Sequence, residues 1–193
     1  MSPDGGEVRV RPVLGVPEIG DGDPLGKLIA DAAGELADGD VLVISQKVVS
    51  KAEGRTRKLS SVIPSAEASK LARILGKEPN LVQLILEESA EVVRAERGVL
   101  IVETRHGLVC ANAGIDSSNV GDTESVLLLP EDPDTSARRL RTEIGGSTGA
   151  NAVPFEVAMA WMNPAIASSS IRNEARKATV AACPALAPNS LKP

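Results

Sequence analysis

The stretch from His106 to Asp134 carries a dense group of polar side chains whose types suit ligand binding. Its centre, Asn112 to Asn119, holds two amides, two hydroxyls and one carboxylate, that of Asp116. Such strings are typical of loops whose side chains bond their own backbone. Here apolar runs precede and follow the loop, and polar loops held between buried strands commonly carry binding residues. A lone carboxylate among neutral oxygen groups also suits Mg²⁺, which takes oxygen ligands and keeps substrate phosphates.

A second candidate is the basic segment from Ser45 to Arg55, which directly follows an apolar strand predicted over Val41–Ile44. In open α/β sheets, ligands gather at the carboxyl ends of strands, where lysines act as point charges for phosphate. The alternative interpretation is a solvated basic loop, and the GxxxxGK[ST] spacing of a Walker loop is absent. The side chains that this segment offers are Lys47, Ser50, Lys51 and Arg55.

Three further features have ordinary structural explanations. The only histidine, His106, precedes a glycine and is interpreted as a turn residue. The carboxylates of Glu87, Glu88 and Glu91 are interpreted as a solvated helix face. The Pro-containing loop over 16–19 is a candidate pocket lining, although its local pattern indicates only a loop.

The overall composition excludes several classes of function. The 193 residues include one Phe, one Trp and no Tyr, and the net charge is −5. The chain therefore has few aromatic side chains on which bases could stack and no net positive charge, and both features argue against a nucleic-acid partner. The sequence shows no apolar run that would span a membrane and no signal-peptide pattern. Cys110 and Cys183 are expected to be small core residues in a reducing compartment, so a cytoplasmic protein is predicted.

Hydrophobic periodicity predicts a mixed α/β fold. We expect helices from an Asp23 cap to about residue 37, from Ser65 to Leu75, from Asn80 onward with Gln83 in a capping box, and over 136–144 until Gly145 and Gly146. The predicted strands cover residues 8–11, 41–44, 99–102, 108–111 and 126–129, and the third and fourth form a hairpin.

The character of the chain changes near residue 150. Acidic side chains outnumber basic ones before this point, and the reverse holds after it, where Ala, Ser, Asn and Pro dominate. We therefore predict a domain over 1–150 and a divergent tail over 151–193, which is helical or partly disordered. Candidate helices in the tail cover 155–162 and 170–183.

Several of these strings together resemble the gamma-glutamyl ligase family of coenzyme F420, a deazaflavin redox cofactor. The resemblance covers about residues 7–150, and the strings occur in the family's order. They are residues 15–18 (GVPE), 38–43 (DGDVLV), 49–55 (VSKAEGR), 112–120 (NAGIDSSNV), 127–130 (LLLP) and 132–134 (DPD).

The resemblance implies a GTP-dependent ligase that joins L-glutamate to the coenzyme F420 precursor through an acyl phosphate. It implies a ligase-type nucleotide-binding fold, a homodimer, and Mg²⁺ or Mn²⁺, with K⁺ as a further candidate cation. Asp116 is expected to bind the metal, and Lys51 and Asp116 are expected to converge on the triphosphate. The residues implied for GTP binding are Val16, Pro17, Glu18, Ile19, Gln46, Lys47, Lys51 and Asn119.

The chain departs from the family's pattern after residue 150. In the family, an Asp-Thr pair on the next strand reaches the metals and a Gly-Arg motif follows, whereas residues 151–193 contain no aspartate. This departure favours a truncated or frame-shifted product, which the DNA sequence beyond the Gly149 codon would test. Two alternatives to ligation therefore stay open: a non-catalytic relic that binds GTP or the coenzyme, and an interaction protein that uses the tail.

Overall fold

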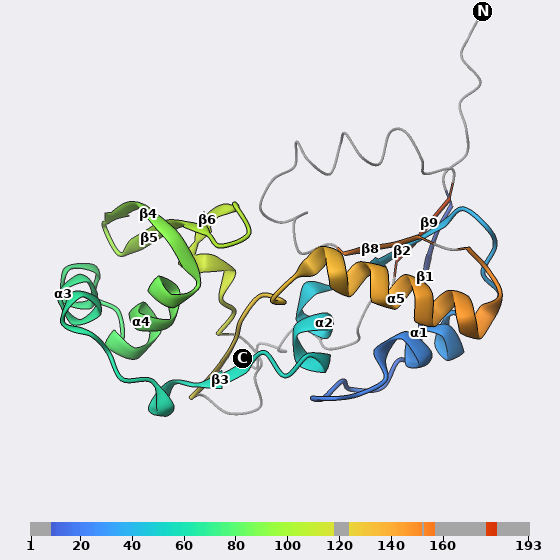
Figure 1. The fold of residues 1–193 in the computed structure, drawn as a ribbon, viewed down its shortest axis with the longest axis horizontal. Coiled ribbons are helices and arrows are strands. Elements are labelled where there is room, and N and C mark those ends of the chain that lie inside the picture. The colour runs from blue at the N-terminus through green and yellow to red at the C-terminus, as the bar shows by residue number, and fades with distance from the viewer. Residues whose placement is uncertain (1–8, 118–123, 152, 157–176, 181–193) are drawn as a thin grey trace, which may run out of the picture. The chain divides into compact units, whose positions relative to one another are not determined.

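The computed structural model describes residues 9–117, 124–151, 153–156 and 177–180, the last two segments as backbone only (Figure 1). The chain divides into two units, which are treated separately below. The first unit comprises Met1–Gly54 and Pro130–Pro193, and the second comprises Arg55–Leu129. Helices and strands occur in both, so the mixed α/β class predicted from the sequence is confirmed.

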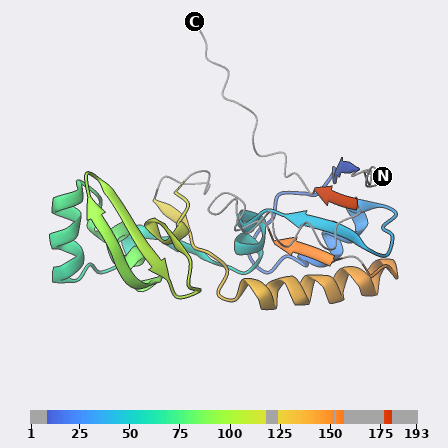
Figure 2. The same cartoon turned by 90° about the horizontal axis from the view of Figure 1, so that it is seen from above.

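The first unit is built on a parallel sheet with the order β1-β9-β2-β8. Its strands are β1 (Val10–Pro12), β2 (Asp40–Ile44), β8 (Val153–Glu156) and β9 (Lys177–Val180). The predicted apolar strand, β2, lies between β9 and β8 and pairs with both in parallel. Residues assigned to the divergent tail therefore supply two strands of this sheet (Figure 2). The predicted helix over 155–162 is wrong at its start, because Phe155 and Glu156 belong to β8. The predicted helix over 170–183 is wrong where Lys177–Val180 form β9.

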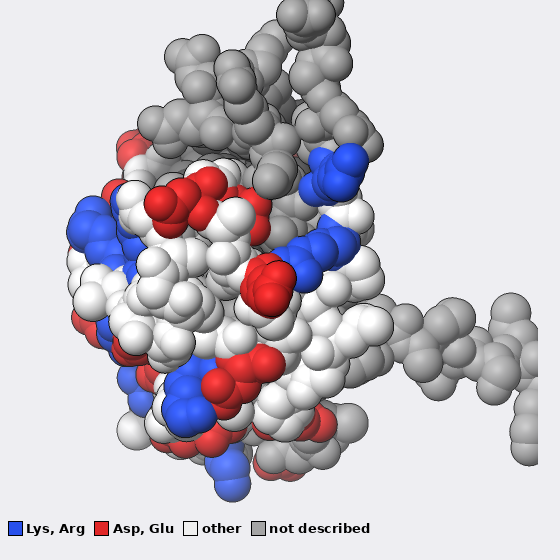
Figure 3. Space-filling view, turned by 90° about the vertical axis from the view of Figure 1, so that its right-hand side faces the viewer, with Lys and Arg blue, Asp and Glu red and all other residues white. Residues whose placement is uncertain are grey.

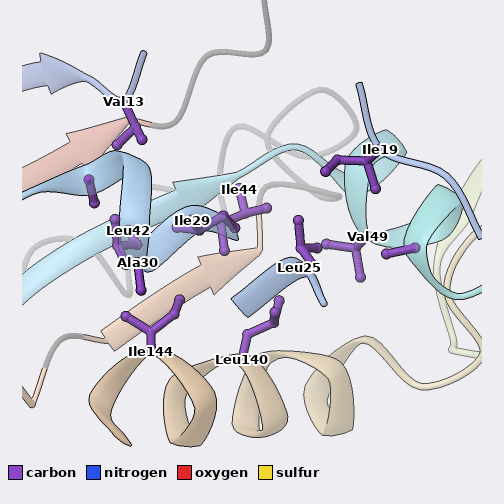
Figure 4. Packing of buried hydrophobic residues seen from close by; sticks show 12 residues of the cluster. Val13, Ile19, Leu25, Ile29, Ala30, Leu42, Ile44, Val49, Leu140 and Ile144 are labelled. Atoms are coloured by element: carbon purple, nitrogen blue, oxygen red, sulfur yellow. The ribbon is translucent and has the colours of Figure 1, made fainter. Parts of the chain in front are cut away.

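Three helices accompany this sheet: α1 (Leu25–Ala33), α2 (Gln46–Ala52) and α5 (Pro133–Thr148). Leu25 and Ile29 of α1 meet Leu140 and Ile144 of α5 in an aliphatic core (Figure 4). The same core takes in Leu42 and Ile44 of β2 and Val49 of α2. Its described members are aliphatic, as the shortage of aromatic residues predicts.

Most of the basic segment after β2 forms helix α2, so the alternative interpretation of a solvated basic loop is wrong. Val49 and Ala52 of α2 are buried in the core, and Val48 packs partly against it. Burying this apolar stripe stabilises a helical conformation in a segment that its lysines alone would leave solvated. Lys47 and Lys51 are consequently one helical turn apart.

Two predicted helix boundaries also need correction. Helix α1 ends at Ala33, because Gly34 adopts a left-handed backbone with φ 67°, and Asp23 accepts a hydrogen bond from the Gly20 N–H instead of capping the helix. Helix α5 begins at Pro133 behind an Asp132 cap and runs past Gly145 and Gly146 to Thr148. Burial of Leu140 and Ile144 offsets the cost of helical glycine, about 1 kcal/mol each.

The second unit contains a three-stranded antiparallel sheet with the order β4-β5-β6. Its strands are β4 (Ser89–Glu96), β5 (Val99–Thr104) and β6 (Val109–Ala111), and the predicted β5–β6 hairpin is confirmed. Helices α3 (Ala66–Leu75) and α4 (Pro79–Glu87) pack on it through a buried cluster. That cluster includes Ala68, Ala72, Val82, Ile85, Leu100 and Val102.

A short ribbon completes the second unit. Strand β3 (Thr56–Lys58) pairs antiparallel with β7 (Ser125–Leu127), and the 3-10 turns η1 (Leu59–Ser61) and η2 (Asn112–Gly114) follow β3 and β6. The Ser65 cap of α3 is confirmed, since its Oγ accepts from the Ala68 N–H at 3.1 Å. Gln83 forms no capping box, because its Oε1 accepts from the Ser65 N–H.

The interpretation of Glu87, Glu88 and Glu91 as one solvated helix face is wrong. Helix α4 ends at Glu87, and Glu91 lies in strand β4. Glu88 is only 8% exposed. Among the residues that the structure describes, no helix combines the length and the apolar character needed to cross a bilayer.

Candidate nucleotide-binding and metal-binding residues

The loop over residues 15–22 packs against α2, and it contains residues 16–19, which are predicted to line the nucleotide site. Ile19 is 3% exposed and shares the core with Val49 of α2. The Gly22 N–H donates to the Ala52 carbonyl at 3.0 Å. A Cβ on Gly54 would lie 2.5 Å from Asp21 Oδ1, and Gly54 has φ 64°, so only glycine permits this approach. The loop and the helix are therefore fixed to each other.

This packing brings two of the predicted residues into direct contact. Lys51 Nζ lies 3.1 Å from Glu18 Oε1. The Lys51 side chain is 20% exposed and the Glu18 side chain is 85% exposed, so the ammonium group leaves a partly buried stem to meet a carboxylate in solvent. Lys47 lies one turn earlier on the same side of α2. The Gln46 amide donates to the buried Ser50 hydroxyl at 2.7 Å, which fixes the first turn of the helix.

The cation of Arg55 is engaged within the second unit. Its Nη2 donates to Glu88 Oε2 at 3.0 Å, and its Nε donates to the Leu129 carbonyl at 2.8 Å. The Arg55 side chain is only 13% exposed. Arg55 is therefore already paired within the protein. Phosphate binding by Lys47 and Lys51 stays a prediction.

Asp116 follows a left-handed turn in the second unit. Asn112, Ala113 and Gly114 have φ of 52°, 54° and 68°. Ala113 is 1% exposed and packs in the apolar cluster, so burial holds a backbone conformation that is rare outside glycine. The backbone of Asp116 then exchanges two hydrogen bonds with Leu127, at 2.9 Å and 2.8 Å. These bonds fix the position from which the carboxylate projects.

Asp116 is a single carboxylate, and its predicted role is to bind a hard cation. Within the described ranges, no three His, Cys, Asp or Glu side chains gather where they would hold a metal. Mg²⁺ is commonly bound by one or two carboxylates, with phosphates and waters completing its shell. Asn112 Oδ1 is buried and has no hydrogen-bond partner among the described residues, so this turn also presents a spare oxygen acceptor. Asn119 lies outside the described residues.

The profile of the F420-0:Gamma-glutamyl ligase family matches residues 14–153. The chain belongs to this gamma-glutamyl ligase family. The matched range contains the loop over 16–19, helix α2 and Asp116, and it ends at the first residue of β8. The family resemblance drawn from the short sequence strings is therefore confirmed.

Three coenzyme F420:L-glutamate ligases are between 46% and 48% identical to this chain. The coenzyme F420:L-glutamate ligase of Methanothermobacter thermautotrophicus is 46% identical over 141 residues, which are 71% of this chain and 56% of the relative. That of Archaeoglobus fulgidus is 48% identical over 142 residues, 74% of this chain and 56% of the relative. That of Methanopyrus kandleri is 47% identical over 137 residues, 71% and 54% respectively. The chain thus matches about half the length of these relatives.

A pocket of about 640 Å³ lies at the opposite end of β2 from α2. It opens near the starts of β1 and β2. Figure 3 shows one face of the molecule, on which acidic and basic side chains lie scattered among neutral ones. The gamma-glutamyl ligase residues expected to bind GTP do not line the pocket. The lining residues are Arg9, Val10, Arg11, Glu35, Leu36, Ala37 and Asp40.

Proposed function

We propose that this chain ligates L-glutamate to the coenzyme F420 precursor, with GTP as the co-substrate. The family match over residues 14–153 carries the proposal, together with relatives that are named coenzyme F420:L-glutamate ligase. The contact between Glu18 and Lys51 supports it, because it joins the two segments that the resemblance assigns to GTP.

The proposed reaction activates a carboxylate. An oxygen of the precursor carboxylate attacks the γ-phosphorus of GTP, the bond to the β,γ-bridging oxygen breaks, and GDP leaves. The glutamate amine then attacks the carbonyl carbon of the acyl phosphate, loses a proton, and expels inorganic phosphate as the amide bond forms. Positioning and charge neutralisation supply most of the catalysis in phosphoryl transfer.

In this proposal the first unit supplies the phosphate-binding cations. Lys51 and Lys47 present two ammonium groups one turn apart on α2, which suits a polyanion. The Glu18 carboxylate is 85% exposed, and an ion pair with so exposed a partner contributes little stability. Lys51 can therefore exchange Glu18 for a phosphate oxygen at small cost, while Val16 to Ile19 line the nucleotide.

Asp116 of the second unit supplies a carboxylate to Mg²⁺ or Mn²⁺ in this proposal. When bound, the cation neutralises charge on the phosphoryl oxygens. The backbone pairing with Leu127 fixes the main chain from which the Asp116 side chain projects. That Lys51 and Asp116 converge on one triphosphate stays a prediction, and so do a homodimer, a cytoplasmic location and a role for K⁺.

A ligation assay tests the proposal. The full chain is incubated with GTP, Mg²⁺, the precursor and isotope-labelled glutamate, and the product mass and GDP are measured together. We expect equimolar product and GDP, and loss of both in Asp116→Asn with an unchanged circular dichroism spectrum. Asp31→Asn is the matched control, because Asp31 is an exposed carboxylate on α1 that pairs with Lys27.

The same assay separates the alternatives. Turnover in Asp116→Asn at the wild-type rate would remove Asp116 from metal binding. GTP binding without product in the wild-type chain would refute ligation and favour a non-catalytic nucleotide-binding protein. A folded chain that binds neither GTP nor the coenzyme would leave the interaction protein as the remaining reading.

A further inference from the structure

We propose that Glu88, together with Arg55 and Arg105, is a positioning residue for the segment that carries Asp116. The proposal concerns the second unit alone and depends on hydrogen bonds between described residues. Only its consequence for cation binding rests on the proposed function.

Glu88 holds two arginines with its two carboxylate oxygens. Oε2 accepts from Arg55 Nη2 at 3.0 Å, and Oε1 accepts from Arg105 Nη2 at 2.9 Å. The side chains of Glu88 and Arg55 are 11% and 13% exposed, whereas Arg105 is 51% exposed. Both carboxylate oxygens of a largely buried group are thus satisfied by cations from two separate parts of the chain.

The Arg55 arm reaches the chain that leaves the Asp116 loop. The guanidinium Nε of Arg55 donates to the Leu129 carbonyl, and the Arg55 carbonyl accepts from the Leu128 N–H at 3.0 Å. Leu127, the preceding residue, exchanges its two backbone hydrogen bonds with Asp116. The Leu129 side chain lies against Gly114, where an added Cβ would be 3.0 Å from it. The position of Arg55 therefore sets the position of the strand that pairs with Asp116.

The Arg105 arm reaches the chain that enters the same loop. Besides its side-chain bond, Arg105 donates its backbone N–H to the Glu88 carbonyl at 3.2 Å. Arg105 begins the β5–β6 turn, which Thr104 closes through bonds with Leu108. Strand β6 then leads directly into the Asn112–Gly114 turn. Glu88 consequently connects to both the entry to and the exit from this loop.

Stability alone explains this arrangement poorly. Replacing a buried ion pair by apolar residues of similar volume is often neutral or stabilising, so such pairs are weak sources of stability. The planar guanidinium of Arg55 instead fixes two acceptors, Glu88 and the Leu129 carbonyl, at a defined angle. Residues that orient a metal ligand from behind act in this way, and losing one typically costs roughly 10–100-fold in metal affinity.

Amide hydrogen exchange, measured by NMR on the full chain, tests the positioning role directly. In Glu88→Gln we expect the Asp116 and Leu127 amides to exchange at least about tenfold faster than in the wild type, relative to the Leu100 and Val102 amides of β5. Equal acceleration of all four amides would indicate general destabilisation and overturn the proposal, and so would an unchanged ratio.

Two further variants serve as a second test and as a control. Arg55→Lys keeps the positive charge but lacks the rigid guanidinium, whose separate nitrogens hold Glu88 and the Leu129 carbonyl. It should therefore raise the same ratio even if Glu88→Gln does not fold. Glu53→Gln is the matched control: Glu53 is 15% exposed and accepts from Arg139 at 2.9 Å and from Ser136 at 2.6 Å in the first unit. Glu53→Gln should leave the ratio of amide exchange rates unchanged, and a rise of this ratio in Glu53→Gln would overturn the proposal.

Titration with Mn²⁺, followed by electron paramagnetic resonance, tests the consequence for the cation. We expect Glu88→Gln to weaken Mn²⁺ binding by roughly tenfold or more, and Glu53→Gln to leave it unchanged. If Asp116→Asn binds as much Mn²⁺ as the wild-type chain, or if the wild-type chain binds none, the proposed metal role of Asp116 fails. The ratio of amide exchange rates then still tests the positioning role of Glu88. If Glu88→Gln binds Mn²⁺ with the wild-type affinity, the proposal that Glu88 positions a metal ligand is overturned.

Discussion

The ammonium group of Lys51 lies 3.1 Å from the carboxylate of Glu18, which comes 33 residues earlier in the chain. The contact joins a Pro-containing loop to the last turn of α2, and each segment is weak as a sequence signal by itself. Because Ile19 and Val49 pack in the same core, the fold brings the backbones of Glu18 and Lys51 close together, although the Glu18 carboxylate itself is exposed. Lys51 is thereby kept at the surface with its stem partly buried.

We predict that Lys51→Met weakens GTP binding by about 10–100-fold, because a charge-assisted hydrogen bond to phosphate contributes roughly 1.5–3 kcal/mol. The free energy of unfolding should change by less than about 1 kcal/mol, since the pair with exposed Glu18 contributes little. Titration with a fluorescent GTP analogue and urea denaturation measure the two quantities.

Lys27→Met is the matched control for this substitution. Lys27 also belongs to a helix of the first unit and pairs with a carboxylate, that of Asp31, at 2.6 Å. Its removal should leave GTP affinity unchanged. Equal GTP affinity in wild type and Lys51→Met would show that α2 is not the phosphate-binding element.

Much of the fold follows from local patterns in the sequence. Strand β2, the β5–β6 hairpin and the Ser65 cap are all foreseen, because each depends on residues close together in the chain. The family is foreseen from short strings, and the profile match confirms it. For the candidate site, the sequence indicates Glu18 and Lys51, but only the core packing of Ile19 explains why they meet.

The misses involve residues whose partners are distant in the sequence. Glu88 stands in a run of glutamates and reads as solvated, and nothing nearby indicates that Arg55 and Arg105 neutralise it from 33 and 17 residues away. Strands β8 and β9 have only four residues each, too few for a sequence pattern to identify them, and they are recognised through parallel pairing with β2. Tertiary context of this kind overrides intrinsic propensity.

The contact between α1 and α5 gives a prediction about stability. A Cβ on Gly26 would lie 2.5 Å from Glu143 Cβ, so Gly26→Ala should destabilise the protein by about 1–3 kcal/mol through overpacking. Gly146, on α5, is exposed and has nothing within 4 Å of an added Cβ. Gly146→Ala should therefore stabilise by about 0.5–1 kcal/mol. Urea denaturation measures the change in the free energy of unfolding for each variant. If both changes have the same sign, the close approach of the two helices is refuted.

Cys110 should be nearly inert to thiol reagents. Burial raises the pKa of its thiol to about 11, and the thiolate is the reactive species. In a Cys183→Ser background, labelling at pH 7.5 should be slow in the folded protein and rapid in urea. Its rate should keep rising up to about pH 11 if the fold survives. Fast labelling of the folded protein at pH 7.5 would contradict the buried position.

The cap of α5 gives a pH dependence whose sign is fixed. The hydroxyl and the backbone N–H of Thr135 both donate to the Asp132 carboxylate, at 2.7 Å and 2.9 Å, and lower its pKa below the ordinary value. A group whose pKa is lowered on folding contributes stability that is present above its unfolded pKa, near 3.9, and is lost as the pH falls through the folded pKa. Asp132→Asn keeps an oxygen cap without the charge. The wild type should therefore be the more stable of the two at pH 7, and this difference should shrink below about pH 4. Urea midpoints measured across this range test it, and a difference that does not vary with pH would show that the Asp132 charge contributes nothing to the cap.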